Sequence, residues 1–134
     1  MIRVQIKKQM HTPRGQEWLD IDLSIDKGEF MTLFGASGAG KTTFLRIMAG
    51  LTRPQEGRIE VDGEIWFDSS KGIDLPIQQR CVGFVSQENT LFPHMTVLEN
   101  LQYACKDREE NAGIDAWLLT MGLKGLGGRR PEQL

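Results

Sequence analysis

One glycine-rich stretch constrains the fold of this 134-residue chain more than any other feature of its sequence. The stretch Gly35–Thr42 reads GASGAGKT and follows Phe30–Phe34, a short and mostly apolar run. Such a run predicts a strand that is buried on both faces of a parallel sheet. Good helix formers fill Thr42–Ala49, and Gly50 stands where a helix C-terminal glycine belongs. A strand, a glycine-rich loop and a helix in this order predict an α/β fold.

The loop matches the phosphate-binding pattern G-x-x-x-x-G-K-[ST] in full, and its flanks fit this P-loop motif as well. Its residues are Gly35, Ala36, Ser37, Gly38, Ala39, Gly40, Lys41 and Thr42. Glycines let backbone N–H groups surround a phosphate, and the following helix adds its positive end. We expect Lys41 to bridge β- and γ-phosphate oxygens and Thr42 to ligate Mg²⁺, which predicts MgATP binding. Thr43 either offers its N–H to the α-phosphate or is an ordinary helix residue.

Composition limits the other classes of function. Hydrophobic residues make up 40% of the chain and charged residues 25%, which is typical of a soluble globular protein. The formal net charge of −2 gives no global attraction to nucleic acid, so no nucleic-acid partner is expected. No run approaches the 18 apolar residues of a membrane span, and Met1–Gln9 lacks a signal-peptide core. Cys81 and Cys105 are interpreted as reduced thiols.

Hydrophobic periodicity predicts the remaining elements. Alternation predicts two strands, and Asp62-Gly63 between alternating runs predicts a hairpin. These strands are Ile2–Ile6, Leu19–Ile25, Arg58–Val61 and Glu64–Phe67. Cys81–Val85 predicts a further core strand. Three- and four-residue spacing predicts two amphipathic helices, one from Val97 to Ala104 or Cys105 and one over Ile114–Met121.

Several segments in register with the loop resemble the nucleotide-binding domain of ABC transporters. They are Gly28–Phe30, Leu45–Leu51, Pro54–Ile59, Gln79–Gln87 and Leu91–Asn100, and the similarity runs from about Ile2 to Leu134. The resemblance implies an α/β P-loop NTPase fold of the ABC type, with an incomplete core sheet, an antiparallel β-subdomain and the start of a helical subdomain. It assigns residues 1–87 to the ATP-binding core and β-subdomain, and residues 88–134 to the beginning of the helical subdomain.

The same resemblance implies roles for residues beyond the loop. Gln87 would contact Mg²⁺ or the attacking water and sense the γ-phosphate. The family often stacks an aromatic residue on adenine from the turn after the first strand. Here that turn, Met10–Pro13, has none, so His11 is the candidate for this position and Trp18 the alternative.

The resemblance also implies partners. A docking segment would receive a coupling helix from a transmembrane permease subunit, and its residues are Leu91, Phe92, Pro93, His94, Met95 and Thr96. An ordinary exposed loop is the alternative, but an apolar cluster in a loop favours docking. A second ATPase subunit would complete a head-to-tail homodimer. The resemblance places the protein in the cytoplasm, peripheral on the inner face of the plasma membrane.

Among ABC proteins, the chain is most similar to the ATPase subunits of molybdate-type importers. Glu64-Ile65 and Lys71–Pro76, followed closely by Gln79-Arg80, carry this similarity. It implies coupling of ATP binding and hydrolysis to the uptake of molybdate or another oxyanion. Sulfate, polyamine and sugar importers share most of these residues, so an importer for another solute is an alternative.

Two family motifs needed for hydrolysis have no counterpart in the 134 residues. There is no Walker B strand with its Asp and catalytic Glu, and no Leu-Ser-Gly-Gly-Gln loop, although Arg129–Leu134 resembles the residues that lead into that loop. We therefore expect this chain by itself to bind ATP without appreciable turnover, and to be marginally stable or oligomeric. A non-catalytic nucleotide-binding fragment is one alternative. A soluble ABC ATPase of DNA repair or translation, with large insertions or a second cassette, is another.

Overall fold

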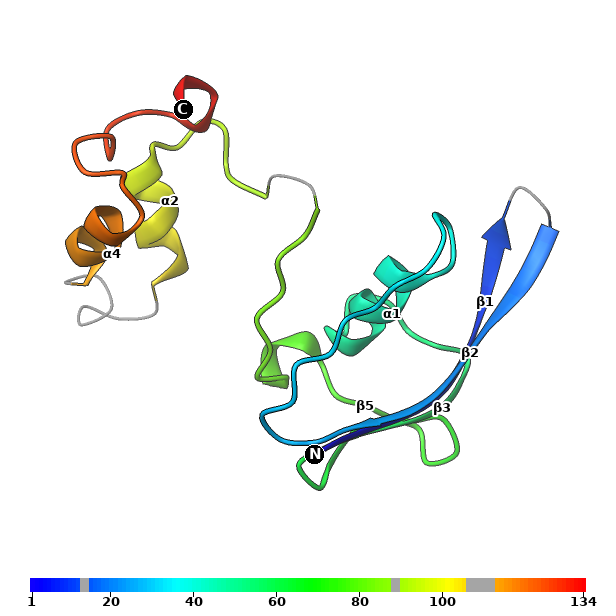
Figure 1. Ribbon diagram of the computed structural model, residues 1–134. Coiled ribbons are helices and arrows are strands. Elements are labelled where there is room, and N and C mark those ends of the chain that lie inside the picture. The colour runs from blue at the N-terminus through cyan, green and yellow to red at the C-terminus, as the bar shows by residue number, and fades with distance from the viewer. Residues whose placement is uncertain (13–14, 88–89, 106–112) are drawn as a thin grey trace. The chain divides into compact units, whose positions relative to one another are not determined.

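A computed structural model describes residues 1–12, 15–87, 90–105 and 113–134 of the chain. These residues fall into two units, Met1–Phe84 and Val85–Leu134 (Figure 1). The first unit contains the glycine-rich loop, and the second contains the predicted docking segment.

A five-stranded antiparallel sheet forms the frame of the first unit, in the order β2-β1-β3-β4-β5. The strands are β1 (Ile2–Thr12), β2 (Gly15–Ile25), β3 (Glu56–Val61), β4 (Glu64–Asp68) and β5 (Ile73–Asp74). The four strands predicted from alternation are confirmed, and the first two are longer than predicted because they pair as one hairpin. The β3–β4 turn has positive φ at Asp62 (48°) and Gly63 (87°), as the Asp-Gly pair predicts.

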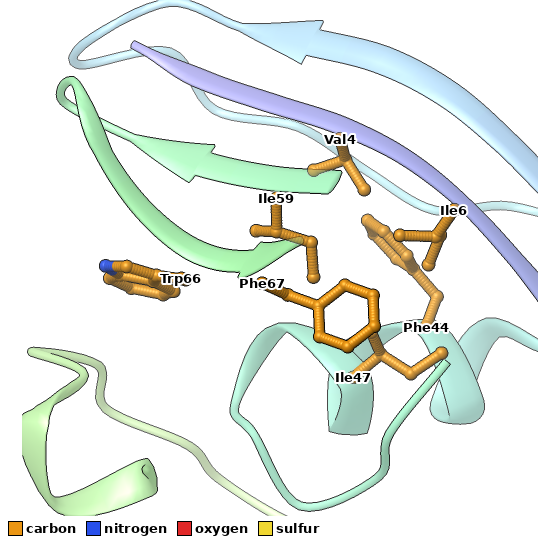
Figure 2. Packing of buried hydrophobic residues seen from close by; sticks show 7 residues of the cluster. All are labelled: Val4, Ile6, Phe44, Ile47, Ile59, Trp66 and Phe67. Carbon is orange, nitrogen blue, oxygen red and sulfur yellow. The ribbon is translucent and has the colours of Figure 1, made fainter. Parts of the chain in front are cut away.

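One face of this sheet packs against helix α1 (Lys41–Met48). The register aligns Val4 of β1 with Ile59 of β3, so both side chains point to the same face. Phe44 and Ile47 of α1 meet them there, and Figure 2 shows this cluster together with Ile6, Trp66 and Phe67. Since these side chains are buried, α1 is anchored on the sheet and carries the loop that precedes it.

Helix α1 ends as the sequence predicts. Gly50 has φ +79°, its N–H donates to the Ile47 carbonyl at 3.0 Å, and the Leu51 N–H donates to the Arg46 carbonyl at 2.8 Å. These two bonds define a Schellman motif, in which a left-handed glycine satisfies the last carbonyl groups of the helix.

Two predicted strands are absent, and the prediction of buried core strands at Phe30–Phe34 and Cys81–Val85 is wrong for this structure. Neither segment forms a helix or pairs as a strand, and Phe34 and Val85 are 100% and 95% exposed. A strand buried on both faces needs hydrogen-bonded neighbours, and the described residues provide none for these segments. All strand pairs among the described residues are antiparallel.

The second unit contains helices α2 (Val97–Ala104) and α4 (Ile114–Thr120), followed by a short 3-10 turn, η2 (Pro131–Gln133). Both predicted helices are present; α2 ends at Ala104, one of the two ends predicted for it, and α4 ends one residue earlier than predicted. Val97, Ile114 and Leu118 form their small buried core. Within the described ranges, no helix combines the length and the apolar character needed to span a bilayer.

Candidate functional site

The glycine-rich loop is a tight turn that leads directly into α1. The Ala39 N–H donates to the Ala36 carbonyl at 3.2 Å and closes the turn. Gly38 and Gly40 have φ values of +81° and +88°, in the left-handed region that side chains other than hydrogen rarely adopt. The backbone path of the loop therefore requires glycine at both positions.

Gly40 also lies close to the β1–β2 hairpin. A Cβ atom at this position would come within 2.9 Å of Leu19 Cδ1 and 3.1 Å of Met10 Sδ. The end of the loop is thus seated on two apolar side chains of the sheet. The sequence did not predict this role for Met10. Its only signal is that Met10 shares the even-numbered positions of Val4 and Ile6, and Lys8 interrupts that alternation.

The N-terminus of α1 is open to an anion. Gly40 is the N-cap residue, no side chain caps the helix, and its first turn contains no acidic residue. The first helical hydrogen bond runs from the Phe44 N–H to the Gly40 carbonyl at 2.8 Å. The N–H groups of Lys41, Thr42 and Thr43 come before this bond and have no acceptor in the preceding turn. Free N–H groups at the positive end of a helix dipole suit a phosphate group.

The Lys41 side chain folds back over the loop. Its Nζ donates to the carbonyl oxygens of Gly35 and Ala36, at 2.7 Å in each case. These bonds use two of the three donors of an ammonium group and hold its charge above the beginning of the loop. Thr42 is exposed in the first turn of α1, and Thr43 is half-buried. A hydroxyl is a hard oxygen ligand of the kind that Mg²⁺ prefers, so Lys41 and Thr42 fit a magnesium-bound triphosphate.

His11 lies in β1 opposite Gln16, and Trp18 lies in β2 opposite Gln9. Successive side chains of a strand point to opposite faces. His11 and Trp18 therefore share the face of the sheet opposite to that of Met10 and Leu19, the residues that approach Gly40. The contact of His11 with adenine stays a prediction, and the structure gives the loop apolar neighbours instead.

Gln87 lies near the beginning of the second unit, at an exposed bend two residues after Val85. Its contact with Mg²⁺ or the attacking water stays a prediction.

The predicted docking segment, Leu91–Thr96, is held in shape by one side chain of α2. Asn100 Nδ2 donates to the carbonyls of Phe92, Met95 and Thr96 at 3.2, 3.2 and 3.0 Å. Asn100 Oδ1 accepts from the Phe92 N–H at 2.9 Å. With four backbone contacts to one amide, the segment is an ordered turn that keeps its apolar side chains outside the core.

Aromatic rings extend the surface of this segment. The Phe92 ring packs edge-on against Tyr103 at 4.8 Å and His94 at 5.8 Å between centroids. Leu91 is 52% exposed and Tyr103 is 67% exposed. The exposed apolar surface of the docking segment therefore includes Tyr103, which the sequence did not predict. Tyr103 lies on α2 beside the segment, and only its helical spacing from Asn100 could have indicated this.

Thr96, the last residue of the segment, is the N-cap of α2. Its side chain accepts from the Glu99 N–H at 3.2 Å, and its own N–H donates to the Glu99 carboxylate at 2.7 Å. This capping box satisfies two N–H groups at the beginning of the helix. The backbone hydrogen bond from Thr96, with that of its side chain, lowers the pKa of Glu99 below its ordinary value.

Comparisons with known proteins identify the family of the chain. A family profile described as "ABC transporter" matches residues 19–134. A molybdenum import ATP-binding protein, ModC, of Vibrio parahaemolyticus is 41% identical over 133 residues, which are 99% of this chain and 35% of that protein. ModC 1 of Azotobacter vinelandii is 44% identical over 109 residues, which are 81% of this chain and 30% of that protein. The chain thus spans about a third of the length of these curated relatives.

Solved structures lead to the same family. A dimeric bacterial ABC transporter cassette is 28% identical, with a TM-score of 0.75 over 100% of this chain and 63% of that chain. A dimeric post-hydrolysis state of an ATP-binding cassette, bound to ADP and phosphate, is 27% identical with the same TM-score and coverage. The α/β fold expected for the incomplete cassette is confirmed by this likeness. The family match over residues 19–134 and the identity to ModC proteins show that the chain belongs to the ABC transporter family.

Proposed function

We propose that the chain binds MgATP at Gly35–Thr42, as part of the ATPase subunit of an importer that couples ATP binding and hydrolysis to solute uptake. One observation carries this proposal. The Lys41 ammonium lies 2.7 Å from two carbonyl oxygens at the beginning of the loop, beside a helix N-terminus that no side chain caps. A positive charge and free N–H groups on one turn are what a triphosphate needs.

Each group at this site would have a distinct task. The N–H groups of the loop and of α1 bind phosphate oxygens. Lys41 exchanges its carbonyl partners for β- and γ-phosphate oxygens, which accept stronger charge-assisted bonds. The Thr42 hydroxyl would hold Mg²⁺, whose charge would offset that of the phosphates. For Gln87 the role of contacting Mg²⁺ rests on the family resemblance alone.

The partners proposed for the chain are a second ATPase subunit and a transmembrane permease subunit, at the cytoplasmic face of the membrane. Support for the first comes from the two similar solved cassettes, both of which are dimeric. Support for the second is the Leu91–Thr96 segment, whose apolar side chains stay exposed while its backbone is tied to Asn100. Exposed apolar clusters on an ordered backbone mark partner sites.

The solute class proposed is molybdate or another oxyanion, since several relatives are molybdenum import ATP-binding proteins. Deleting the coding region in its own organism and measuring cellular molybdenum by mass spectrometry tests this. We expect accumulation from low external molybdate to fall, and re-expression of the intact gene to restore it. Unchanged molybdenum together with reduced uptake of sulfate or a sugar would favour an importer for another solute.

Calorimetric titration with MgATP tests the nucleotide site. Lys41→Ala should weaken binding about 10- to 100-fold, because a hydrogen bond to a charged group contributes roughly 1.5–3 kcal/mol. Lys71→Ala removes an equal charge from an exposed turn far along the sequence and should change affinity less than about twofold. Equal affinities for the Lys41 variant and the parent would rule out the proposed site.

A further inference from the structure

Arg80 is a buried cation at the C-terminal end of α1, and its side chain is only 3% exposed. Nη1 donates to the Ile47 carbonyl at 2.9 Å and to the Met48 carbonyl at 3.3 Å. These carbonyls belong to the last turn of the helix, where backbone acceptors lack partners within the helix. Arg80 therefore caps α1 with a positive charge, at the end of the helix dipole that favours one.

The other donors of the same guanidinium reach the sheet and the chain beyond it. Nε donates to the Leu75 carbonyl at 2.9 Å, and Nη2 donates to Asp74 Oδ1 at 3.2 Å and to the Trp66 carbonyl at 3.5 Å. The guanidinium carbon also lies 5.7 Å from the Trp66 ring centroid. One planar group thus joins the end of α1 to β4 and β5.

Gly50 leaves room for this group. A Cβ atom at Gly50 would come within 2.9 Å of Arg80 Nε and 3.0 Å of Arg80 Cζ. The glycine that ends α1 is therefore also the point where the guanidinium passes closest to the backbone. Burial lowers the pKa of Arg80, and the Asp74 carboxylate opposes that shift.

Helix α1 is consequently held at both ends. Gly40 rests on Leu19 and Met10 at the N-terminus, and Arg80 binds the C-terminus. The helix has eight residues, a length of about 12 Å, so a tilt at one end displaces the other.

We propose that Arg80 is a positioning residue for the phosphate-binding loop, which fixes the axis of α1 and with it the direction of the free N–H groups. This inference rests on the proposed nucleotide site and concerns how that site is kept in shape. Lysine does not replace arginine here, because a single ammonium cannot reach the carbonyls of α1, the Trp66 carbonyl of β4 and the Leu75 carbonyl after β5 from one buried position.

The test compares Arg80→Lys and Arg80→Met with Asp68→Ala in the full chain. Asp68 lies in the same sheet and accepts hydrogen bonds from Ser70 and the Lys71 N–H. Its loss should therefore destabilise a turn that, among the described residues, makes no hydrogen bond or ion pair with α1. Three quantities are measured: the melting temperature, the MgATP affinity, and amide hydrogen exchange at Lys41–Met48 relative to the β1–β2 hairpin.

Both Arg80 variants should bind MgATP at least about tenfold more weakly, because small displacements of a binding group are costly. They should also raise exchange in α1 more than in the hairpin. Asp68→Ala should lower the melting temperature but keep the affinity within about twofold of the parent. Weaker MgATP binding in the Arg80 variants, but not in the destabilised Asp68 variant, distinguishes a positioning role from a general loss of stability.

Several results would overturn the inference. One is an MgATP affinity in folded Arg80→Met equal to that of the parent. Another is a loss of affinity in Asp68→Ala as large as that in the Arg80 variants. A third is complete unfolding of both Arg80 variants, which would make Arg80 a determinant of the fold alone. If instead neither the parent nor Lys41→Ala binds MgATP, the proposed function fails. The exchange comparison then still decides whether Arg80 orders α1.

Discussion

The Lys41 ammonium lies 2.7 Å from the carbonyl oxygen of Gly35, six residues earlier in the chain. This contact closes the loop on itself, and places the charge of the first helical residue above the point where the loop begins. A ligand with stronger acceptors than a peptide carbonyl would take over these bonds without moving the backbone. The loop is in this sense preorganised for an anion, since its charge and its free N–H groups already lie on one turn.

The first prediction separates the two loop glycines. Gly38 and Gly40 both have positive φ, but only Gly40 has a neighbour in the way of a Cβ atom, Leu19 Cδ1 at 2.9 Å. Gly38→Ala should cost about 1–2 kcal/mol of unfolding free energy from backbone strain alone. Gly40→Ala should cost more and should also weaken MgATP binding, because the end of the loop is pushed off the hairpin. Urea denaturation and calorimetry measure both effects, and equal costs would contradict the contact with Leu19.

A second prediction concerns the metal. Thr42→Val keeps the shape of the side chain but removes its hydroxyl, whereas Thr42→Ser keeps the hydroxyl. The quantity of interest is the ratio of the ATP affinity with Mg²⁺ to the ATP affinity with a chelator. We expect this ratio to fall in the valine variant and to stay at the parent value in the serine variant. Calorimetry with and without Mg²⁺ gives this ratio. A ratio unchanged in Thr42→Val would exclude Thr42 as a ligand.

The sequence predicted the local parts of this fold and missed the parts that depend on distant partners. Asp62-Gly63 and the alternation around it are sufficient for a hairpin, and Gly35–Thr42 is sufficient for the loop and the beginning of α1. Phe30–Phe34 has the composition of a buried strand, but a strand also needs pairing that no local pattern encodes. Arg80 was missed for the same reason, because it binds carbonyls 33 and 32 residues away.

The third prediction is a pH dependence in the second unit. Because hydrogen bonds from Thr96 lower the pKa of Glu99 in the folded state, its carboxylate stabilises the fold above the ordinary glutamate range. This contribution is lost as the pH falls through that range toward the lowered pKa. Glu99→Gln should therefore lower the melting temperature at pH 7 and narrow the difference between pH 7 and pH 3. Glu132→Gln, which removes the same charge from another exposed position, is the control. An equal narrowing of the melting-temperature difference in Glu132→Gln would contradict the capping role of Glu99.

A fourth prediction concerns the docking segment. Asn100→Ala removes four backbone contacts from Leu91–Thr96 and should cost about 1–3 kcal/mol, because carbonyl and N–H groups lose their partner. Hydrogen exchange at the Phe92 N–H should rise with it. Gln102→Ala, an exposed change on the same helix, should leave both quantities near the parent values. An unchanged exchange rate at Phe92 in Asn100→Ala would show that the segment keeps its shape without the amide.

A fifth prediction tests the proposed permease contact of the docking segment. If Leu91–Thr96 is the surface that a membrane-embedded subunit contacts, Phe92→Ala should reduce co-purification with that subunit while MgATP affinity stays within about twofold of the parent. If Phe92→Ala instead lost nucleotide binding and kept co-purification, the assignment of Phe92 to the docking surface would be wrong.

The most direct test of the account is a nuclear magnetic resonance titration of backbone amides with MgATP. We predict that the largest shifts fall on the N–H groups of Gly38–Thr43, and that magnesium tripolyphosphate, which has no base or sugar, reproduces them at the same residues. Lys41→Ala should reduce these shifts at equal ligand concentration. Shifts that cluster elsewhere in the described chain, or an unchanged spectrum from folded protein at saturating nucleotide, would contradict a phosphate site at the beginning of α1.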